Sequence, residues 1–292
     1  MELEINKINI SDKGYPSLLK RIPDPPATLY FRGDLTCLKN NCFAIVGTRR
    51  CSAYGKEITM AIAMDLARAG LVIVSGLAPG IDTFSHLACL EANSRTVAVL
   101  GTGLDEKSIY PRENLKLSRK IIETGGCLIS EYPAGTHGSK MTFPARNRII
   151  SGVSLGTLVV EAKYKSGALI TANFARKQKR LLFAVPGDIH FANSQGPHLL
   201  IKTGAKLTEN AKDILKEINP SRQNVFLFAP PKLIDNEEPN PIIEVLKRGP
   251  TSTDEIIEKT GLDPAVVISG LTILEINDKV RNLGGNTYSL KR

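Results

Sequence analysis

The feature of this sequence that most constrains its fold is a series of six short apolar runs between residues 43 and 187. Continuous runs of Val, Ile and Leu are typical of strands that are buried on both faces of a sheet. Between the first two runs, Ile58, Ile62 and Leu66 follow helical spacing, and Gly70 ends that pattern. The alternation predicts a doubly wound α/β sheet whose strands are mostly parallel. The runs are FAIVG (43–47), LVIVSG (71–76), TVAVLG (96–101), CLISE (127–131), TLVVEA (157–162) and LLFAVPG (181–187).

The length of the chain leaves room for a second unit. With 292 residues, of which 42% are hydrophobic, it can bury a full-sized core and a smaller one. We assign residues 1–37 to a lead-in segment that packs on the main domain, and residues 38–218 to the α/β domain itself. Residues 219–239 are rich in proline and polar residues and predict a linker, which leaves residues 240–292 for the second unit.

The pattern of the second unit is typical of a winged helix. Three helical segments, PIIEVLKRG, STDEIIEKTG and DPAVVISGLTILEIND, follow the linker. Ser252 or Thr253 caps the second segment, while Asp263 caps the third and Pro264 occupies its first turn. Two strand-like pieces, KVRNL and NTYSL, follow the third helix on either side of two glycines. Three helices and a β-hairpin predict the winged variant of the helix-turn-helix.

The net charge of +9 is concentrated in one stretch of the chain. Between His137 and Lys206 there are eleven basic and two acidic residues, so this stretch alone accounts for the whole excess. From Pro239 onward, seven basic residues are balanced by seven acidic ones. A localised basic field favours a polyanionic partner, although a solvated basic face would have the same composition. The neutral second unit is a poor candidate for strong phosphate binding.

The candidate ligand site lies in the loops that follow the apolar runs, because open α/β sheets bind ligands beyond the carboxyl ends of their strands. The loop GTRRCSAYG after the first run lacks the GxGxxG spacing of a dinucleotide site, yet it enters a helix. Its amides and Arg49 are therefore candidates for holding a phosphate. Four residues form the predicted phosphate loops, namely Gly47 and Thr48 after the first run and Ser75 and Gly76 after the second.

The octapeptide FPARNRII, residues 143–150, lies between the fourth and fifth runs and allows two interpretations. It is either a turn that leads into a helix anchored by Ile149 and Ile150, or a platform for a polyanion. In the second case, guanidinium groups bind phosphates and the ring of Phe143 stacks a base. The sequence leaves open whether Arg146 and Arg148 contact a ligand or brace neighbouring loops.

Several other classes of function find no support in the sequence. The four histidines lack metal-ligand spacing, and the five cysteines contain no CxxC pair, so we predict no metal, no cofactor and no disulfide framework. Asp82 and His86 are four residues apart on a predicted helix, where capping or packing is favoured over acid–base catalysis. No apolar run reaches about 18 residues and the first residues do not form a signal peptide, which predicts a cytoplasmic protein without membrane contact.

Seven segments of the chain, in this order, closely resemble the DNA processing protein A (DprA/Smf) family. The resemblance extends from about Tyr15 to about Ala205, and the winged helix is similar to the family's C-terminal domain. It implies an extended Rossmann-like domain. The segments are AIVGTRRCSAYG, VSGLAPGIDTFSH, AVLGTGLDEKSIYP, LISEYPAG, FPARNRIISG, VVEAKYKSGALIT and FAVPGDI.

The resemblance implies a nonenzymatic protein that binds single-stranded DNA, usually as a homodimer. Members protect incoming strands during natural transformation and help to load the RecA recombinase onto DNA covered by single-strand binding protein. Both proteins are thus candidate partners. The residues that we expect to contact the strand are Arg49, Lys140, Phe143, Arg146, Asn147, Lys163 and Lys202.

A rival interpretation makes the chain an enzyme. Phosphoribohydrolases that act on nucleoside monophosphates have a related sheet and use a glycine-rich loop, an arginine and a glutamate. Glu161, which ends a predicted strand beside the helix entry SGALITA, is the candidate for that glutamate. The PGGxGTxxE signature of those enzymes is missing, however, because the nearest match, SLGTLVVEA, places its GT inside a strand. We therefore favour the binding protein.

Overall fold

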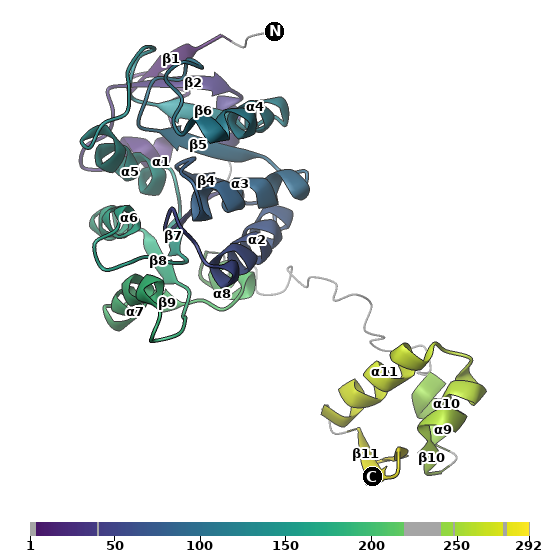
Figure 1. Ribbon diagram of the computed structural model, residues 1–292. Coiled ribbons are helices and arrows are strands. Elements are labelled where there is room, and N and C mark those ends of the chain that lie inside the picture. Colours follow the sequence, from purple (N-terminus) through teal and green to yellow (C-terminus); the bar gives the residue numbers. More distant parts are fainter. Residues whose placement is uncertain (1–3, 40, 219–240, 248, 277–278, 292) are drawn as a thin grey trace. The chain divides into compact units, whose positions relative to one another are not determined.

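The computed structural model describes residues 4–39, 41–218, 241–247, 249–276 and 279–291 (Figure 1). Contacts along the chain divide it into two compact units, Met1–Phe226 and Leu227–Arg292, which we describe separately. The predicted linker, residues 219–239, lies outside the described residues. We call the first unit the larger unit and the second the winged-helix unit.

All six predicted strands are present in the larger unit, and they pair in parallel in the order β6-β5-β4-β3-β7-β8. Every residue of the first five is buried, which agrees with helices covering both faces of the sheet. The doubly wound α/β prediction is thus confirmed. The strands are β3 (Cys42–Val46), β4 (Val72–Ser75), β5 (Thr96–Leu100), β6 (Cys127–Ser130), β7 (Gly156–Val159) and β8 (Leu181–Ala184).

The lead-in segment is more than a packing element, because it adds two strands to the sheet. β2 (Thr28–Gly33) pairs antiparallel with β6, and β1 (Asn6–Asn9) pairs antiparallel with β2. Neither was predicted, since an antiparallel strand that is covered on one face only does not need a continuous apolar run. Two-residue β9 (Lys206–Leu207) ends the sheet beside β8, so nine strands form it within the described residues.

Two sets of helices cover the two faces of the sheet, as Figure 1 shows. One face carries α2 (Ala53–Arg68), α3 (Ile81–Glu91) and α4 (Leu115–Glu123), and α8 (Ala211–Ile218) contacts α2. The other carries α1 (Ser17–Lys20), α5 (Thr142–Gly152), α6 (Gly167–Lys177) and α7 (Gln195–Lys202). The short helices η1 (Leu35–Lys39), η2 (Arg112–Asn114) and η3 (Ala192–Ser194) complete the unit.

The strand order places a topological switch point between β3 and β7. From β3 the chain moves through β4 and β5 to β6, and then returns to add β7 on the opposite side of β3. The loops that follow β3 and β7 therefore diverge at the carboxyl edge of the sheet. Crevices at such points are where open α/β sheets bind ligands.

The winged-helix unit has the predicted helices and hairpin. Ser252 caps α10, its hydroxyl oxygen accepting a hydrogen bond from the amide of Glu255. Strand β10, which pairs with β12, was not predicted because it is only two residues long. The core contains Ile242, Ile256 and Val267. The elements are α9 (Pro241–Leu246), β10 (Thr251–Ser252), α10 (Thr253–Thr260), α11 (Pro264–Ile276), β11 (Val280–Gly284) and β12 (Thr287–Leu290).

Candidate nucleic-acid interface

A cavity of about 540 Å³ lies at the switch point. The loop after β3 supplies Arg49 and Arg50, the loop after β7 supplies Lys163, and the first turns of α5 and α6 complete the wall. Arg49 and Lys163 are exposed, and each lies in the loop that leaves the carboxyl end of its strand, after Val46 and Val159 respectively. The doubly wound topology thus brings together two basic side chains that are 114 positions apart in the sequence.

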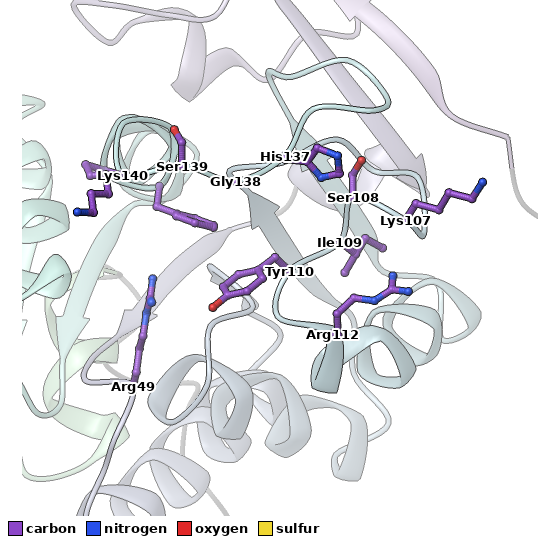
Figure 2. A pocket seen from close by; sticks show the side chains of 12 residues that line it. Arg49, Lys107, Ser108, Ile109, Tyr110, Arg112, His137, Gly138, Ser139 and Lys140 are labelled. Carbon is purple, nitrogen blue, oxygen red and sulfur yellow. The ribbon is translucent and has the colours of Figure 1, made fainter.

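A second cavity, of about 770 Å³, adjoins the first and shares Arg49, Phe143 and Pro144 with it. In the view of Figure 2, Tyr110 lies in the middle, with Arg49 and Lys140 on one side and Lys107 and Arg112 on the other. None of the twelve described residues that line it is acidic. The second cavity is therefore an electropositive hollow at the carboxyl edge of β5.

Phe143 forms the boundary between the two cavities and is partly exposed to both. Its ring rests where Gly101 and Gly138 leave space, because a Cβ atom built on Gly138 would be only 2.3 Å from the ring. The guanidinium carbon of Arg49 lies 5.7 Å from the ring centroid, which is within cation–π range. The ring is thus held in place by its surroundings, and part of its surface is open to a ligand.

The helix interpretation of FPARNRII is confirmed, and the platform interpretation remains a prediction for Phe143. α5 begins at Thr142, and the hydroxyl oxygen of Ser139 accepts hydrogen bonds from the amides of Met141 and Thr142. Ile149 and Ile150 are buried in the core, as the helix interpretation predicts. Phe143, one turn earlier, remains at the cavities. The helix therefore anchors the octapeptide while its start presents the ring.

Arg146 is a buried brace rather than an exposed contact. Its Nη1 donates to the carbonyls of Gly76, at 2.8 Å, and of Val99, joining the ends of two strands. Burial, partly offset by Asp82, lowers the pKa of Arg146 to about 10. Asn147 accepts from Arg146 Nε at 3.1 Å and donates to the carbonyl of Gly167 at 3.1 Å. Arg146 and Asn147 line the switch-point cavity but are buried, and their polar atoms hold the loops together, so we leave them out of the strand contacts proposed below.

Arg148 also braces the site. Its guanidinium donates to both carboxylate oxygens of Glu131, and its Nε lies 3.0 Å from a carboxylate oxygen of Asp24. These two ion pairs tie α5 to the end of β6 and to the lead-in segment. Carboxylates raise the pKa of Arg148, although burial acts in the opposite direction. Arg146 and Arg148 therefore both brace neighbouring loops, which is one of the two roles that the sequence left open.

The predicted phosphate loops need correction. Ser75 is fully buried, and its hydroxyl donates to the carbonyl of Ile45 at 2.6 Å. The amide of Gly76 donates to Asp82 at 3.0 Å, and that of Thr48 donates to the carbonyl of Glu161 at 2.7 Å. Gly47 lines the switch-point cavity, but a Cβ there would overlap Ile81, so its role is close packing. The amides of Thr48 and Gly76 are therefore already used within the protein. The exposed group of these loops is the side chain of Arg49.

Lys202 lies at the wrong edge of the sheet for the predicted site. It ends α7, and a helix between parallel strands runs from the carboxyl edge back to the amino edge. The same holds for Arg176 and Lys177, which end α6. The basic stretch of the sequence is therefore divided between two edges, and only Lys140, Lys163 and Lys165 contribute exposed charges near the cavities.

Glu161, the candidate catalytic residue of the rival interpretation, is buried and already bonded. Its two carboxylate oxygens accept from the amide of Ser52 at 2.9 Å and from the Ser52 hydroxyl at 2.5 Å. Gly55 leaves room for the carboxylate, since a Cβ atom there would lie 2.5 Å from it. Glu161 thus fastens the start of α2 to the end of β7. No observation favours the hydrolase.

Asp82 and His86 have the capping and packing roles that the sequence favoured. Asp82, in the first turn of α3, accepts the bond from Gly76. Its pKa is raised by burial, although Arg146 acts in the opposite direction. His86 Nδ1 lies 2.8 Å from the hydroxyl of Thr96, and burial together with Arg146 lowers the pKa of His86 to about 3. Both side chains are buried, Asp82 in the wall of the switch-point cavity and His86 beneath it.

The loop between β5 and α4 contains site residues that the sequence analysis did not single out. Lys107, Tyr110 and Arg112 line the second cavity, as does His137 from the loop after β6. Their only signal was position, since GTGLDEKSIYP directly follows the third apolar run. In the described ranges, no helix combines the length and apolarity that a bilayer requires, and no cluster of His, Cys, Asp or Glu is arranged to hold a metal ion.

Comparisons with known proteins agree along most of the chain. Residues 6–219 match the family model of DNA recombination-mediator protein A, and residues 228–286 match that of the DprA winged helix domain. The DNA processing protein DprA of Bacillus subtilis is 48% identical over 218 residues, which cover 74% of this chain and 72% of the relative. Protein Smf of Escherichia coli is 36% identical over 295 residues, covering 95% and 75%.

Two solved structures share the fold. The DprA structure from Streptococcus pneumoniae is 42% identical with a TM-score of 0.69, covering 73% of this chain and 74% of that one. DNA processing protein A from Helicobacter pylori is 31% identical with a TM-score of 0.66, covering 75% and 99%, and its structure describes a single-stranded DNA binding mode.

Proposed function

This chain belongs to the DNA recombination-mediator protein A family, and from that premise we propose that its larger unit binds single-stranded DNA at the carboxyl edge of the sheet. The proposed strand contacts are Arg49, Lys140 and Lys163 for phosphates and Phe143 for a base. The Helicobacter pylori relative, whose structure concerns single-stranded DNA binding, supports the choice of ligand.

The observation that carries this proposal is the combination of exposed cations with a seated aromatic ring. Arg49, Lys140 and Lys163 surround Phe143 in two adjoining cavities. The cations are attracted to a sequence-independent phosphate backbone, and base stacking on an aromatic ring is equally tolerant of sequence. The site therefore fits a strand of any sequence.

The position of Phe143 supports a preference for single strands over duplexes. The ring is recessed between Gly101 and Gly138, so a base must leave its own stack to reach it. Unpaired bases do this at low cost, whereas bases in a duplex first lose their pairing and stacking. We expect little sequence preference because neither contact uses the base edges.

The cellular role that we propose follows the family. The protein protects incoming single strands during natural transformation and helps to load the RecA recombinase, with single-strand binding protein as a further partner on the DNA. It acts as a cytoplasmic homodimer and without catalysis. Family membership is the support for these statements.

Binding assays over a salt series test the proposal. Single-stranded oligonucleotides of mixed sequence should shift in a gel at lower protein concentration than blunt duplexes of the same length. The logarithm of the binding constant should fall with the logarithm of the salt concentration, because phosphate contacts release counterions. Equal or tighter binding to the duplex would contradict the proposal.

A matched pair of phenylalanine variants tests the stacking contact. Phe143→Ala should weaken single-strand binding by about 1 to 3 kcal/mol while leaving the salt slope unchanged, because the lost contact is uncharged. Phe191→Ala is the control, since Phe191 is exposed but lines neither cavity. Melting temperatures must accompany both assays: a Phe143→Ala protein that binds normally, or that loses binding only by unfolding, would exclude the stacking role.

A further inference from the structure

Tyr110 is an exposed aromatic side chain beside Phe143 that the contacts proposed above do not use. The two ring centroids are 5.5 Å apart, and their planes are inclined by 46°. Tyr110 is 49% exposed, and both rings line the second cavity. Figure 2 shows Tyr110 projecting into the middle of that cavity. An exposed large aromatic ring inside a basic hollow requires an explanation.

The loop that carries Tyr110 is firmly held. Asp105 accepts hydrogen bonds from the hydroxyl of Ser108 at 2.9 Å and from the amide of Gly135 at 2.7 Å. The amide of Gly103 donates to the carbonyl of Thr136 at 2.9 Å. These bonds join the loop after β5 to the loop after β6. The ring of Tyr110 is therefore presented on a pre-organised support, which lowers the entropic cost of binding a ligand.

The geometry excludes a single base held between the two rings. A base between two aromatic faces needs nearly parallel rings about 7 Å apart, twice the ~3.5 Å contact distance of carbon atoms. Rings 5.5 Å apart and inclined by 46° leave no such slot. Each ring can instead stack one base on its open face, so the pair suits two different bases of one strand.

Charges beyond Tyr110 extend the basic surface in the same direction. Lys107 and Arg112 are both exposed and line the second cavity on the side away from Arg49 in Figure 2. The Nη1 of Arg112 donates to the carbonyl of Glu106 at 2.5 Å, which orients the guanidinium along the wall. A strand that passes Phe143 and Tyr110 thus meets further phosphate partners.

We propose that Tyr110 is a second stacking position for single-stranded nucleic acid, so that the larger unit holds two bases of one strand, on Phe143 and on Tyr110, and the strand continues toward Lys107 and Arg112. This inference rests on the proposed function, because it extends the same site. Its chemistry is that of an unpaired nucleotide within a strand, recognised by its flat face and its phosphate.

A tryptophan reporter tests the inference directly, because the chain contains no tryptophan. Tyr110→Trp introduces a single indole whose fluorescence should be quenched when oligo(dT) stacks on it, with the same midpoint as the gel shift. Leu207→Trp on β9, an exposed apolar position away from both cavities, is the control and should keep its fluorescence. A Tyr110→Trp protein that binds oligo(dT) without quenching overturns the inference. If the unaltered protein binds no oligonucleotide, the proposed function itself has failed.

Substitutions distinguish a stacking position from a mere support for Phe143. Tyr110→Ala should weaken binding about 5- to 150-fold, the equivalent of one stacked base, whereas Tyr110→Phe should bind normally. The losses from Tyr110→Ala and Phe143→Ala should nearly multiply in the double variant if each ring holds its own base. A double variant that binds as well as Phe143→Ala alone would show that Tyr110 acts only through Phe143, and would overturn the inference.

Discussion

The two units of this protein differ in how their charges are arranged. The winged-helix unit has a topology that many DNA-binding proteins use, yet from Pro239 onward its basic and acidic residues are equal in number, seven of each. Two of its lysines, Lys247 and Lys259, pair with glutamates one helical turn away. In the larger unit, Arg49, Lys140 and Lys163 surround an aromatic ring in cavities where the one acidic lining residue, Asp82, is buried. In the function that we propose, the nucleic-acid surface is the one with unbalanced charge beside an exposed ring, and not the one with the winged-helix topology.

The units also differ in how they are stabilised beneath their surfaces. The larger unit places Arg146, Asp82 and His86 in its interior, where hydrogen bonds to strand ends compensate for their burial. The described core of the winged-helix unit is a small apolar cluster around Ile256 and Val267. Changes to these three buried side chains should consequently affect the larger unit alone, and the predictions that follow use this difference.

The largest effect is expected from Arg146→Ala. Removing this guanidinium leaves the buried carboxylate of Asp82 without its neighbouring positive charge and the carbonyl of Gly76 without its donor, which should cost about 3 to 5 kcal/mol of folding free energy. Urea unfolding followed by circular dichroism should show this loss in the larger unit while the transition of the winged-helix unit is unchanged. Arg68→Ala, at an exposed site, is the control and should cost less than about 0.5 kcal/mol. Equal stability of the two variants would contradict the bracing role.

The next effect concerns pH. His86 is neutral in the folded protein because its pKa is lowered to about 3, whereas in the unfolded chain it binds a proton near pH 6.5. The stability that it contributes is complete above pH 6.5 and is lost as the pH falls toward 3. Between pH 7 and pH 5 the larger unit should lose about 2 kcal/mol.

His86→Asn should remove most of this pH dependence. All four histidines precede residue 199, so the winged-helix unit should keep its stability over the same range. The raised pKa of Asp82 acts in the opposite sense at lower pH, and measurements should therefore stop at pH 5. An unchanged pH profile in His86→Asn would show that another group is responsible.

A smaller effect is expected on the salt dependence of DNA binding. Arg49→Ala and Lys163→Ala should each reduce the slope of log K against log salt by about 0.7, one phosphate contact on a single strand. Lys202→Ala, at the amino edge of the sheet, and Lys259→Ala, in the winged-helix unit, should leave the slope unchanged. A slope that falls as much in either control would move the site away from the cavities.

The smallest effect is expected from removing residues 240–292. Because the excess charge lies in the larger unit, the truncated protein should bind single strands within about twofold of the whole chain, or less than about 0.5 kcal/mol. Fluorescence anisotropy with a labelled oligonucleotide is precise enough to detect this. A truncated protein that is folded but no longer binds would reverse the comparison between the two units.

Local signals account for the parts of the fold that could be predicted from the sequence. Six buried strands, the helices of the winged-helix unit and the Ser252 cap are encoded by continuous apolar runs and capping residues. Strands β1, β2, β9 and β10 lack such signals, because they are short or covered on one face only. Their pairing depends on the sheet that receives them.

The sequence by itself determined which loops converge, because the residues that follow parallel strands share one edge of the sheet. The two cavities are accordingly lined by the predicted residues Arg49, Lys140, Phe143 and Lys163. Only the tertiary structure decided the direction of each side chain. Arg146 and Asn147 follow Phe143 by a single helical turn and line the switch-point cavity, yet both are buried and bonded to neighbouring loops. The hydroxyl of Ser75 is likewise used by the protein, in a hydrogen bond to β3. Lys202 is carried to the far edge by its helix. The position of a residue along the chain determines the loop in which it lies. Whether its polar atoms bond to the protein or stay available to a ligand depends on how the side chain packs.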